Sequence, residues 1–288
     1  MSETNIAILK ALRERTGAGV VACRNALAEA GGDTERAADI LRERETHVAQ
    51  AKVQRIAAQG VIGVWIADSR AVLLEVNCES DFVARSSEFV SGVSECLRIA
   101  VEHDTDDDLL GNRQIDAVLT SLSARTGERV LLRRARVVPI TSEQIVSTYV
   151  HGGDGRNVGR IGVVVALDLP QSNEANELTH GLAMHIAASA PQWISADDIP
   201  ADVLEGKRAE FSAEAMRAGK PPAIVPRIVE GRVEKYVAQS TLLGQPYALN
   251  PDDRVGDVLG RVGESAGRAV VVRHFLRFQV GETELDSA

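Results

Sequence analysis

Basic residues are scarce in this sequence relative to acidic ones. The 32 Lys and Arg residues are outnumbered by 41 Asp and Glu residues, which gives a formal net charge of −9 at pH 7. A protein that holds a nucleic-acid backbone usually carries the opposite sign, because it neutralises phosphates and releases their counterions. The composition therefore argues against direct binding of nucleic acid.

Cysteine and long apolar runs are also in short supply. The three cysteines, Cys23, Cys78 and Cys96, are widely spaced, which suits reduced thiols better than a disulfide framework. No residues have metal-ligand spacing, so neither a metal nor another cofactor is expected. No apolar run approaches the roughly 20 residues of a membrane span, and charges interrupt the apolar positions of residues 1–17. We therefore expect a cytoplasmic protein without a membrane or secretory segment.

Residues 1–50 are predicted to form a module of three short helices. Apolar residues recur at steps of three and four, and Thr16–Gly19 separates the first two stripes. Gly31 or Gly32 can adopt the positive φ of a helix C-terminal cap, and Asp33 can cap the third helix. The positions predicted to be buried are Ile8, Leu9, Leu12, Val20, Cys23, Leu27, Ala30, Ala37, Ile40 and Leu41.

Two stretches, residues 55–142 and 143–280, repeat one order of patterns: two β-rich runs, then a helical periodicity. This repetition predicts a duplicated α+β core. Within the second stretch, residues 201–237 show two helical patterns with few apolar positions, separated by "GKPP". A glycine and two prolines force a reversal there, so we expect an inserted antiparallel helical hairpin, more plausible as a contact surface than as a core. Residues 281–288 are a short acidic tail.

Three features invite a chemical interpretation. Cys78 could be a nucleophile, but no histidine is near it in the sequence, and a lone cysteine at a strand end is usually a small buried hydrophobe. Residues 151–160 are rich in glycine, yet they match neither a Walker nor a dinucleotide motif and precede a strand, so a hairpin loop is favoured. His185 is on the apolar face of its helix, where a core histidine is expected.

A fourth feature is "NCESDFVARSSEF", residues 77–89, in which an acid directly precedes an aromatic residue at the start of a helical pattern. The spacing alone favours a structural interpretation. In it Ser80 or Asp81 caps a helical turn, a contribution of about 1 kcal/mol, and Phe82 packs in the core.

Four segments point to a family when they are taken together. They are "LRERTGAGVVACRNALAEAGGD", "VNCESDFVARSSEF", "HIAASAPQWIS" and "GKPPAIVPRIVEGRVEKYVAQSTLLGQP". In order and spacing the chain resembles elongation factor Ts over nearly its whole length. The resemblance implies a nucleotide exchange factor for elongation factor Tu, the GTPase that carries aminoacyl-tRNA to the ribosome. It also implies a three-helix module resembling ubiquitin-associated domains, two related α+β halves and an inserted helical arm.

The resemblance also implies particular functional residues. A Thr-Asp-Phe-Val motif of the family corresponds here to Ser80, Asp81, Phe82 and Val83, which are expected to enter the GTPase near its Mg²⁺ site and so release GDP. Binding alone performs this exchange, so the protein is not expected to be an enzyme. Further contacts with elongation factor Tu, in its GDP-bound and nucleotide-free forms, are implied for Arg13, Val20, Val21, His151, Gln245 and Pro246.

One departure and two alternatives remain at this point. Many family members continue past the last strand into a C-terminal helical module, for which "VGETELDSA" is too short; we expect a smaller interface and faster dissociation. One alternative is a docking protein without exchange activity, in which deletion of residues 1–47 abolishes all function. The other is a thiol-dependent enzyme that uses Cys78.

Overall fold

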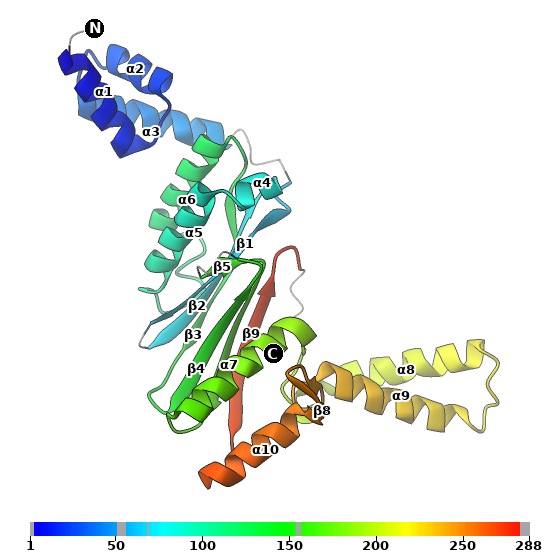
Figure 1. The fold of residues 1–288 in the computed structure, drawn as a ribbon. Coiled ribbons are helices and arrows are strands. Elements are labelled where there is room, and N and C mark those ends of the chain that lie inside the picture. Colours follow the sequence, from blue (N-terminus) through cyan, green and yellow to red (C-terminus); the bar gives the residue numbers. More distant parts are fainter. Residues whose placement is uncertain (1–2, 51–55, 68, 154–156, 283–288) are drawn as a thin grey trace. The chain divides into compact units, whose positions relative to one another are not determined.

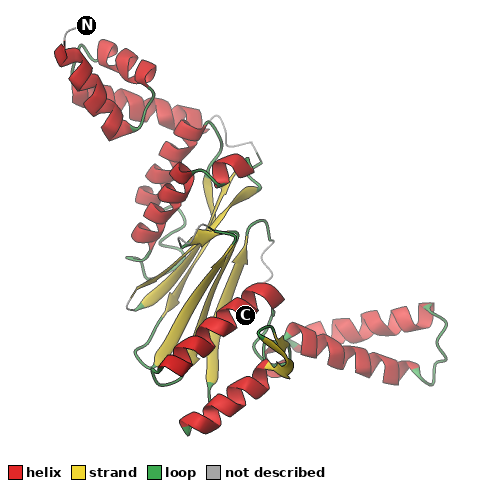
Figure 2. Ribbon diagram, viewed as in Figure 1, coloured by secondary structure: helices red, strands yellow, loops and turns green. Residues whose placement is uncertain are grey.

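Figure 1 shows the computed structural model of the chain, which describes residues 3–50, 56–67, 69–153 and 157–282. Helices and strands occur throughout (Figure 2), so the fold class is α+β, as predicted. The chain forms two compact units. Unit 1 contains residues 1–65, 72–138 and 153–160, and unit 2 contains residues 66–71, 139–152 and 161–288. The last six residues of the predicted acidic tail, 283–288, lie outside the described residues.

Unit 1 begins with the predicted three helices, α1 (Glu3–Thr16), α2 (Val20–Glu29) and α3 (Thr34–Gln50). Their small core contains most of the predicted apolar positions, and the fully or nearly buried members are Leu12, Cys23, Ala26, Ala30, Ala37, Ala38 and Leu41. One assignment was wrong: Val20 is 47% exposed, and the buried face of α2 begins at Cys23 instead.

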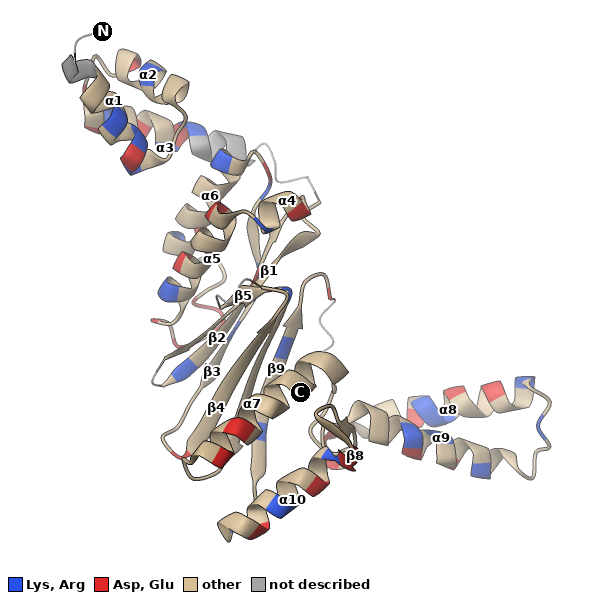
Figure 3. Ribbon diagram, in the orientation of Figure 1, with Lys and Arg blue, Asp and Glu red and all other residues tan. Residues whose placement is uncertain are grey.

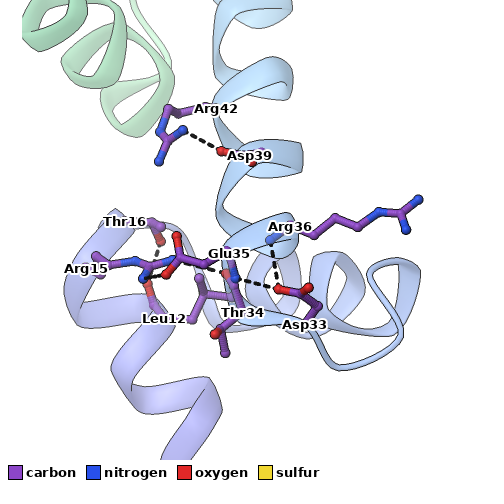
Figure 4. A network of polar contacts seen from close by, with 9 residues as sticks. All are labelled: Leu12, Arg15, Thr16, Asp33, Thr34, Glu35, Arg36, Asp39 and Arg42. Atoms are coloured by element: carbon purple, nitrogen blue, oxygen red, sulfur yellow. Dashed lines mark hydrogen bonds and ion pairs between the residues drawn. The ribbon is translucent and has the colours of Figure 1, made fainter.

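Polar contacts fix the turns of this module (Figure 4). Asp33 caps α3 as predicted, because its Oδ1 accepts the N–H groups of Glu35 and Arg36 at 2.9 and 3.1 Å. The preceding Gly31 and Gly32 have φ values of +65° and +92°, a region that favours glycine. The predicted cap between α2 and α3 is therefore confirmed.

The rest of unit 1 is a four-stranded sheet covered by helices. The sheet order is β3-β2-β1-β5. A hydrophobic core joins these strands to α5 and α6, with Phe89, Leu97 and Leu122 among its fully buried side chains. The bounds of these elements are β1 (Gln59–Ala67), β2 (Arg70–Cys78), α4 (Asp81–Ala84), α5 (Ser87–Ala100), α6 (Arg113–Thr126), β3 (Leu131–Pro139) and β5 (Val158–Gly159).

Unit 2 is built around a three-stranded antiparallel sheet of order β4-β6-β9, which α7 contacts. Its other elements are the arm, a two-stranded ribbon and a last helix. The bounds are β4 (Gln144–His151), β6 (Ile161–Asp168), α7 (Asn173–Ser189), a short 3₁₀ turn (Ala196–Asp198), α8 (Ala201–Arg217), α9 (Val225–Ser240), β7 (Pro246–Tyr247), β8 (Asn250–Arg254), α10 (Val255–Ala266) and β9 (Val271–Gln279).

The two sheets repeat one topology. The strands that correspond are β1, β2 and β3 in unit 1 and β4, β6 and β9 in unit 2. In each trio the second strand lies between the other two, and the third strand follows a helical connection. The repeated order read from the sequence is therefore present in the structure. The loop between β4 and β6 is the predicted glycine-rich connection, but it also supplies β5, which pairs with β1 through Ile62–Gly159 and Gly63–Val158. The sequence pattern did not indicate that short strand.

The inserted hairpin consists of α8 and α9, as expected (Figure 1). Its thin seam buries Ala215, Val225, Val229 and Val233. Gly219 has a φ of +69° and ends the first helix, so the reversal at "GKPP" uses the conformation that glycine allows. Basic and acidic residues are interspersed along both helices (Figure 3), and Arg232 pairs with Glu214 across the seam at 2.6 Å.

Candidate functional site

Residues 80–83 form the turn between β2 and α5, where α4 makes a single helical turn. Ser80 is the N-cap of α4, and its Oγ accepts the N–H of Val83 at 3.3 Å. At the other end, the Ser86 N–H and hydroxyl both donate to the carbonyl of Val83, at 3.0 and 2.8 Å. The predicted cap at Ser80 is confirmed, and the turn is held at both of its ends.

Phe82 is the most exposed large apolar side chain among the described residues, at 86%. The structural interpretation in which it packs in the core is therefore wrong. Only the opposite side of the short α4 turn faces inward, where Ala84 is buried and Val83 packs against the core. Burying an exposed phenylalanine yields about 1.5–3 kcal/mol, so a partner that covers Phe82 gains binding energy.

Asp81 lies beside Phe82 on the exposed side of the turn. Its Oδ2 is 3.2 Å from an Arg85 guanidinium nitrogen, and both side chains are mainly exposed. A pair of this kind contributes only about 0–1 kcal/mol. The carboxylate can therefore exchange Arg85 for donors of another molecule at little cost.

Glu128, from the loop after α6, holds the residues that precede α4. Its Oε2 accepts the N–H groups of Glu79 and Ser80 at 3.0 and 2.9 Å, and its Oε1 accepts the Ser80 hydroxyl at 2.5 Å. In return, Glu79 Oε1 accepts the N–H of Arg129 at 2.6 Å. Sequence reasoning missed Glu128, because its partners are 48 and 49 positions away and no local pattern joins them.

The residues implied for partner contact in the N-terminal module are at its surface. Arg13 is exposed on α1, and Val20 and Val21 are 47% and 60% exposed at the start of α2. Two adjacent exposed valines leave apolar surface that the module does not cover itself. Their exposure places them as a contact surface requires.

The residues implied in unit 2 differ in accessibility. His151 is exposed at the end of β4, with Nδ1 3.3 Å from Tyr149 Oη. Pro246 is exposed at the start of β7, whereas Gln245 is only 6% exposed. Both N–H groups of the Gln245 amide have backbone acceptors, the carbonyls of Ser189 and Gln239, at 3.2 and 2.6 Å. Gln245 therefore supports unit 2 from inside, and Pro246 is the accessible member of the pair.

His185 is the core histidine that its place on the apolar face of α7 predicted. The N–H of Ala248 donates to its Nδ1 at 3.1 Å, so Nε2 carries the proton and donates to Gln245 Oε1 at 2.9 Å. Burial lowers the pKa of His185, and the bond to Gln245 opposes this only in part. The ring is neutral at pH 7 and structural.

The burial and the raised pKa of the Cys78 thiol exclude the alternative of a thiol-dependent enzyme. Its sulfur is buried and donates to the carbonyl of Ser80 at 3.2 Å. Burial raises the pKa of this thiol to about 12, with a further rise from the nearby Glu128 carboxylate. A buried thiol of that pKa supplies almost no thiolate at pH 7, so Cys78 is no nucleophile.

The described residues contain no group of three or more His, Cys, Asp or Glu side chains arranged to hold a metal ion. Within the same ranges, no helix has the length and apolar character needed to cross a membrane.

Comparisons with known proteins agree with this architecture. A family profile described as "Elongation factor TS" matches residues 79–282. A protein of Zymomonas mobilis named elongation factor Ts is 38% identical over 289 residues, covering 98% of this chain and 94% of that protein. Proteins with the same name from Magnetococcus marinus and Rhodospirillum centenum are 38% and 37% identical, over 96% and 98% of this chain and 92% and 94% of their own lengths.

Proposed function

The chain belongs to the elongation factor Ts family, the nucleotide exchange factors of elongation factor Tu in translation elongation, and we propose that Ser80–Val83 is the element that releases GDP. The single observation that carries the proposal is Phe82, 86% exposed at the tip of a turn held at both ends. A rigid turn that presents an apolar ring to solvent is suited to insertion into a partner. The protein acts in the cytoplasm, where elongation takes place.

The chemistry of the bound nucleotide explains why insertion releases it. Backbone N–H groups and a Mg²⁺ ion hold the phosphates of GDP, and Mg²⁺ tolerates little departure from octahedral oxygen geometry. The Phe82 ring, placed among the elements that position this ion and its waters, displaces them. Burial of the ring provides about 1.5–3 kcal/mol toward that displacement.

Asp81 acts beside the ring. Its carboxylate gives up the exposed pair with Arg85 and accepts hydrogen bonds from the GTPase, which anchors the turn in the partner. Its negative charge close to the phosphate site also disfavours rebinding of GDP. Ser80 and Val83 have supporting roles, since Ser80 caps the turn and Val83 packs against the unit 1 core.

The exchange is a coupling between two binding events, and no covalent bond forms or breaks. The factor by which this protein weakens nucleotide binding is also the factor by which nucleotide weakens its own binding. GTP in excess over GDP therefore displaces the protein and gives the exchange its direction.

Other surfaces contribute affinity in this proposal. The exposed Val20 and Val21, with Arg13, dock the N-terminal module on the GTPase, and His151 with Pro246 forms the contact of unit 2. Gln245 contributes indirectly, because its amide fixes the chain that presents Pro246.

The test is the release of a fluorescent GDP from elongation factor Tu, followed by stopped flow. The native protein accelerates release by orders of magnitude. Phe82→Ala lowers the saturating rate about 10- to 100-fold, the factor that matches the lost burial energy, and Asp81→Ala lowers it less. Leu110→Ala, which trims another exposed apolar side chain of unit 1, is the matched control and keeps the native rate. A Phe82→Ala protein with native exchange would refute the insertion mechanism.

A further inference from the structure

We propose that Glu128 is a positioning residue for nucleotide exchange, whose carboxylate fixes the turn that presents Asp81 and Phe82 to the GTPase. The inference rests on the proposed function of Ser80–Val83 and deepens it. It assigns a role to a residue 48 positions from Ser80, in a loop that carries no motif of its own.

The contacts form a reciprocal clamp between two loops. Three donors of Glu79 and Ser80 converge on the two Glu128 oxygens, at 2.5 to 3.0 Å, while the Arg129 N–H donates to Glu79. Each of these bonds has a carboxylate acceptor, the kind that is about twice as strong as a bond between neutral groups. Among the described residues, Glu128 is the one carboxylate that accepts hydrogen bonds from the Ser80 N–H and hydroxyl.

Glu128 is itself anchored to a rigid element. It follows Gly127, whose φ of +78° ends α6 in the left-handed conformation. The Ser123 hydroxyl donates to the Glu128 carbonyl at 2.5 Å, and Thr126 Oγ1 accepts the Glu128 N–H at 3.4 Å. Because α6 packs into the unit 1 core through Leu119 and Leu122, the clamp ties the exchange turn to that core.

The α4 turn depends on this support. It contains only four residues, Asp81–Ala84, and a single helical turn is not stable through its own hydrogen bonds. The orientation of the α4 turn is therefore set by the hydrogen bonds that hold the residues before and after it. Ser86 fixes the exit, and Glu128 fixes the entry, so the backbone that carries Phe82 is held in one conformation before the partner arrives. Such preorganisation reduces the ordering cost of binding.

Two substitutions of Glu128 distinguish the effect of its hydrogen bonds from the effect of its negative charge. In Glu128→Gln the amide oxygen can accept both backbone N–H groups, and the amide nitrogen can donate to Ser80 Oγ. The clamp survives although the charge is gone. In Glu128→Ala the N–H groups of Glu79 and Ser80 both lose their acceptor, and the entry to α4 is released.

The experiment measures the saturating rate of GDP release from elongation factor Tu for five proteins: native, Glu128→Ala, Glu128→Gln, Phe82→Ala and the double variant Glu128→Ala/Phe82→Ala. Glu128→Ala slows release at least about fivefold, the factor for roughly 1 kcal/mol. Glu128→Gln keeps the geometry of the clamp with weaker, neutral bonds, so its rate lies between those of the native protein and Glu128→Ala. In the Phe82→Ala background, Glu128→Ala adds less than about twofold, because its effect passes through the ring.

Controls and outcomes separate this proposal from the one on which it rests. Glu95→Ala, which removes another part-exposed carboxylate of unit 1, keeps the native rate, and circular dichroism melting verifies folding of each variant. A native rate for Phe82→Ala would overturn the proposed function. Slow release by Phe82→Ala with a native rate for folded Glu128→Ala would overturn the positioning role alone. So would an equal effect of Glu128→Ala in both backgrounds, since Glu128 would then act independently of Phe82.

A second variant covers the case in which Glu128→Ala does not fold. Ser80→Ala removes one of the three donors, together with the cap on the Val83 N–H, and leaves both backbone bonds to Glu128 in place. Its release rate falls between those of Glu128→Gln and Phe82→Ala. A native rate for Ser80→Ala would then overturn the positioning role.

Discussion

The turns that follow β2 and β6 occupy the same topological place, because β2 lies between β1 and β3 as β6 lies between β4 and β9, yet the two turns differ in what they expose. Both lead to a helix capped by a serine: Ser80 accepts the Val83 N–H, and Ser172 accepts the Ala175 N–H at 3.0 Å. After β6 the chain passes into α7 with Leu169 buried. After β2 it makes the extra turn α4 and exposes Phe82.

The comparison separates what the fold requires from what function adds. The serine caps occur at both turns, so they belong to the shared architecture. The buried Leu169 shows that an apolar residue beside such a turn can be covered within its own unit. Phe82 is not covered, and exposing a large aromatic side chain brings no gain in stability. The ring is therefore left available for burial by a partner, as the proposed function requires.

The largest expected effect contrasts the two apolar side chains. Leu169→Ala lowers the free energy of unfolding by about 2–5 kcal/mol, because it leaves a cavity in the core of unit 2. Phe82→Ala changes that free energy by less than about 0.5 kcal/mol, because the ring contacts mainly solvent. Urea titration followed by circular dichroism measures both. A large loss of stability in Phe82→Ala would remove the contrast and assign the ring to the core.

A smaller effect concerns the buried histidine of unit 2. Burial lowers the pKa of His185, so below about pH 6.5 the unfolded chain binds a proton that the folded chain resists. The stability that the neutral ring contributes is present above that pH and is lost as pH falls, by at most about 1.4 kcal/mol per pH unit. Urea titrations between pH 7.5 and 5.5 measure the slope.

The control for this pH effect is His185→Leu. It is less stable than the native protein at pH 7.5, because the Gln245 oxygen and the Ala248 N–H lose their partner. Its stability depends less on pH in the same window. A variant with the native slope would show that His185 does not titrate on unfolding as described.

The smallest expected effect on stability comes from removing the serine cap at each of the two turns, and it best distinguishes their roles. Ser80→Ala and Ser172→Ala each remove an N-cap and cost about 1 kcal/mol of stability. Only Ser80→Ala slows GDP release, because only that turn carries Phe82. The two variants are measured side by side by thermal melting and by stopped flow. Equal exchange rates in both variants would count against the separate role of the first turn.

Much of this molecule could be read from local sequence. Helical periodicity, the glycines at 31 and 32 and the reversal at Gly219 are local signals, and each has its expected structural consequence. The two-residue strand Val158–Gly159 is too short to leave a pattern. Val20 was placed in the core because it fits the apolar stripe of α2, yet the helix begins there and leaves it exposed.

The candidate site needed more than local patterns. Spacing placed Phe82 inside, and only the resemblance to a family suggested a partner. Glu128 contacts Ser80, 48 positions away, and His185 contacts Gln245, 60 positions away. A single sequence contains no signal for contacts over such separations. Long-range polar contacts are set by the assembled fold, so the structure was needed to find them.

Insertion of Phe82 into the GTPase can be measured by alkylation of a cysteine placed at that position. The three native cysteines are buried, so a thiol introduced by Phe82→Cys is alkylated fastest, and its rate can be followed by mass spectrometry. Leu110→Cys is the matched control at another exposed apolar position. Saturating nucleotide-free elongation factor Tu is expected to protect the Phe82→Cys thiol strongly and the Leu110→Cys thiol little. Equal alkylation of the Phe82→Cys protein, free and in the complex, would contradict insertion of this turn.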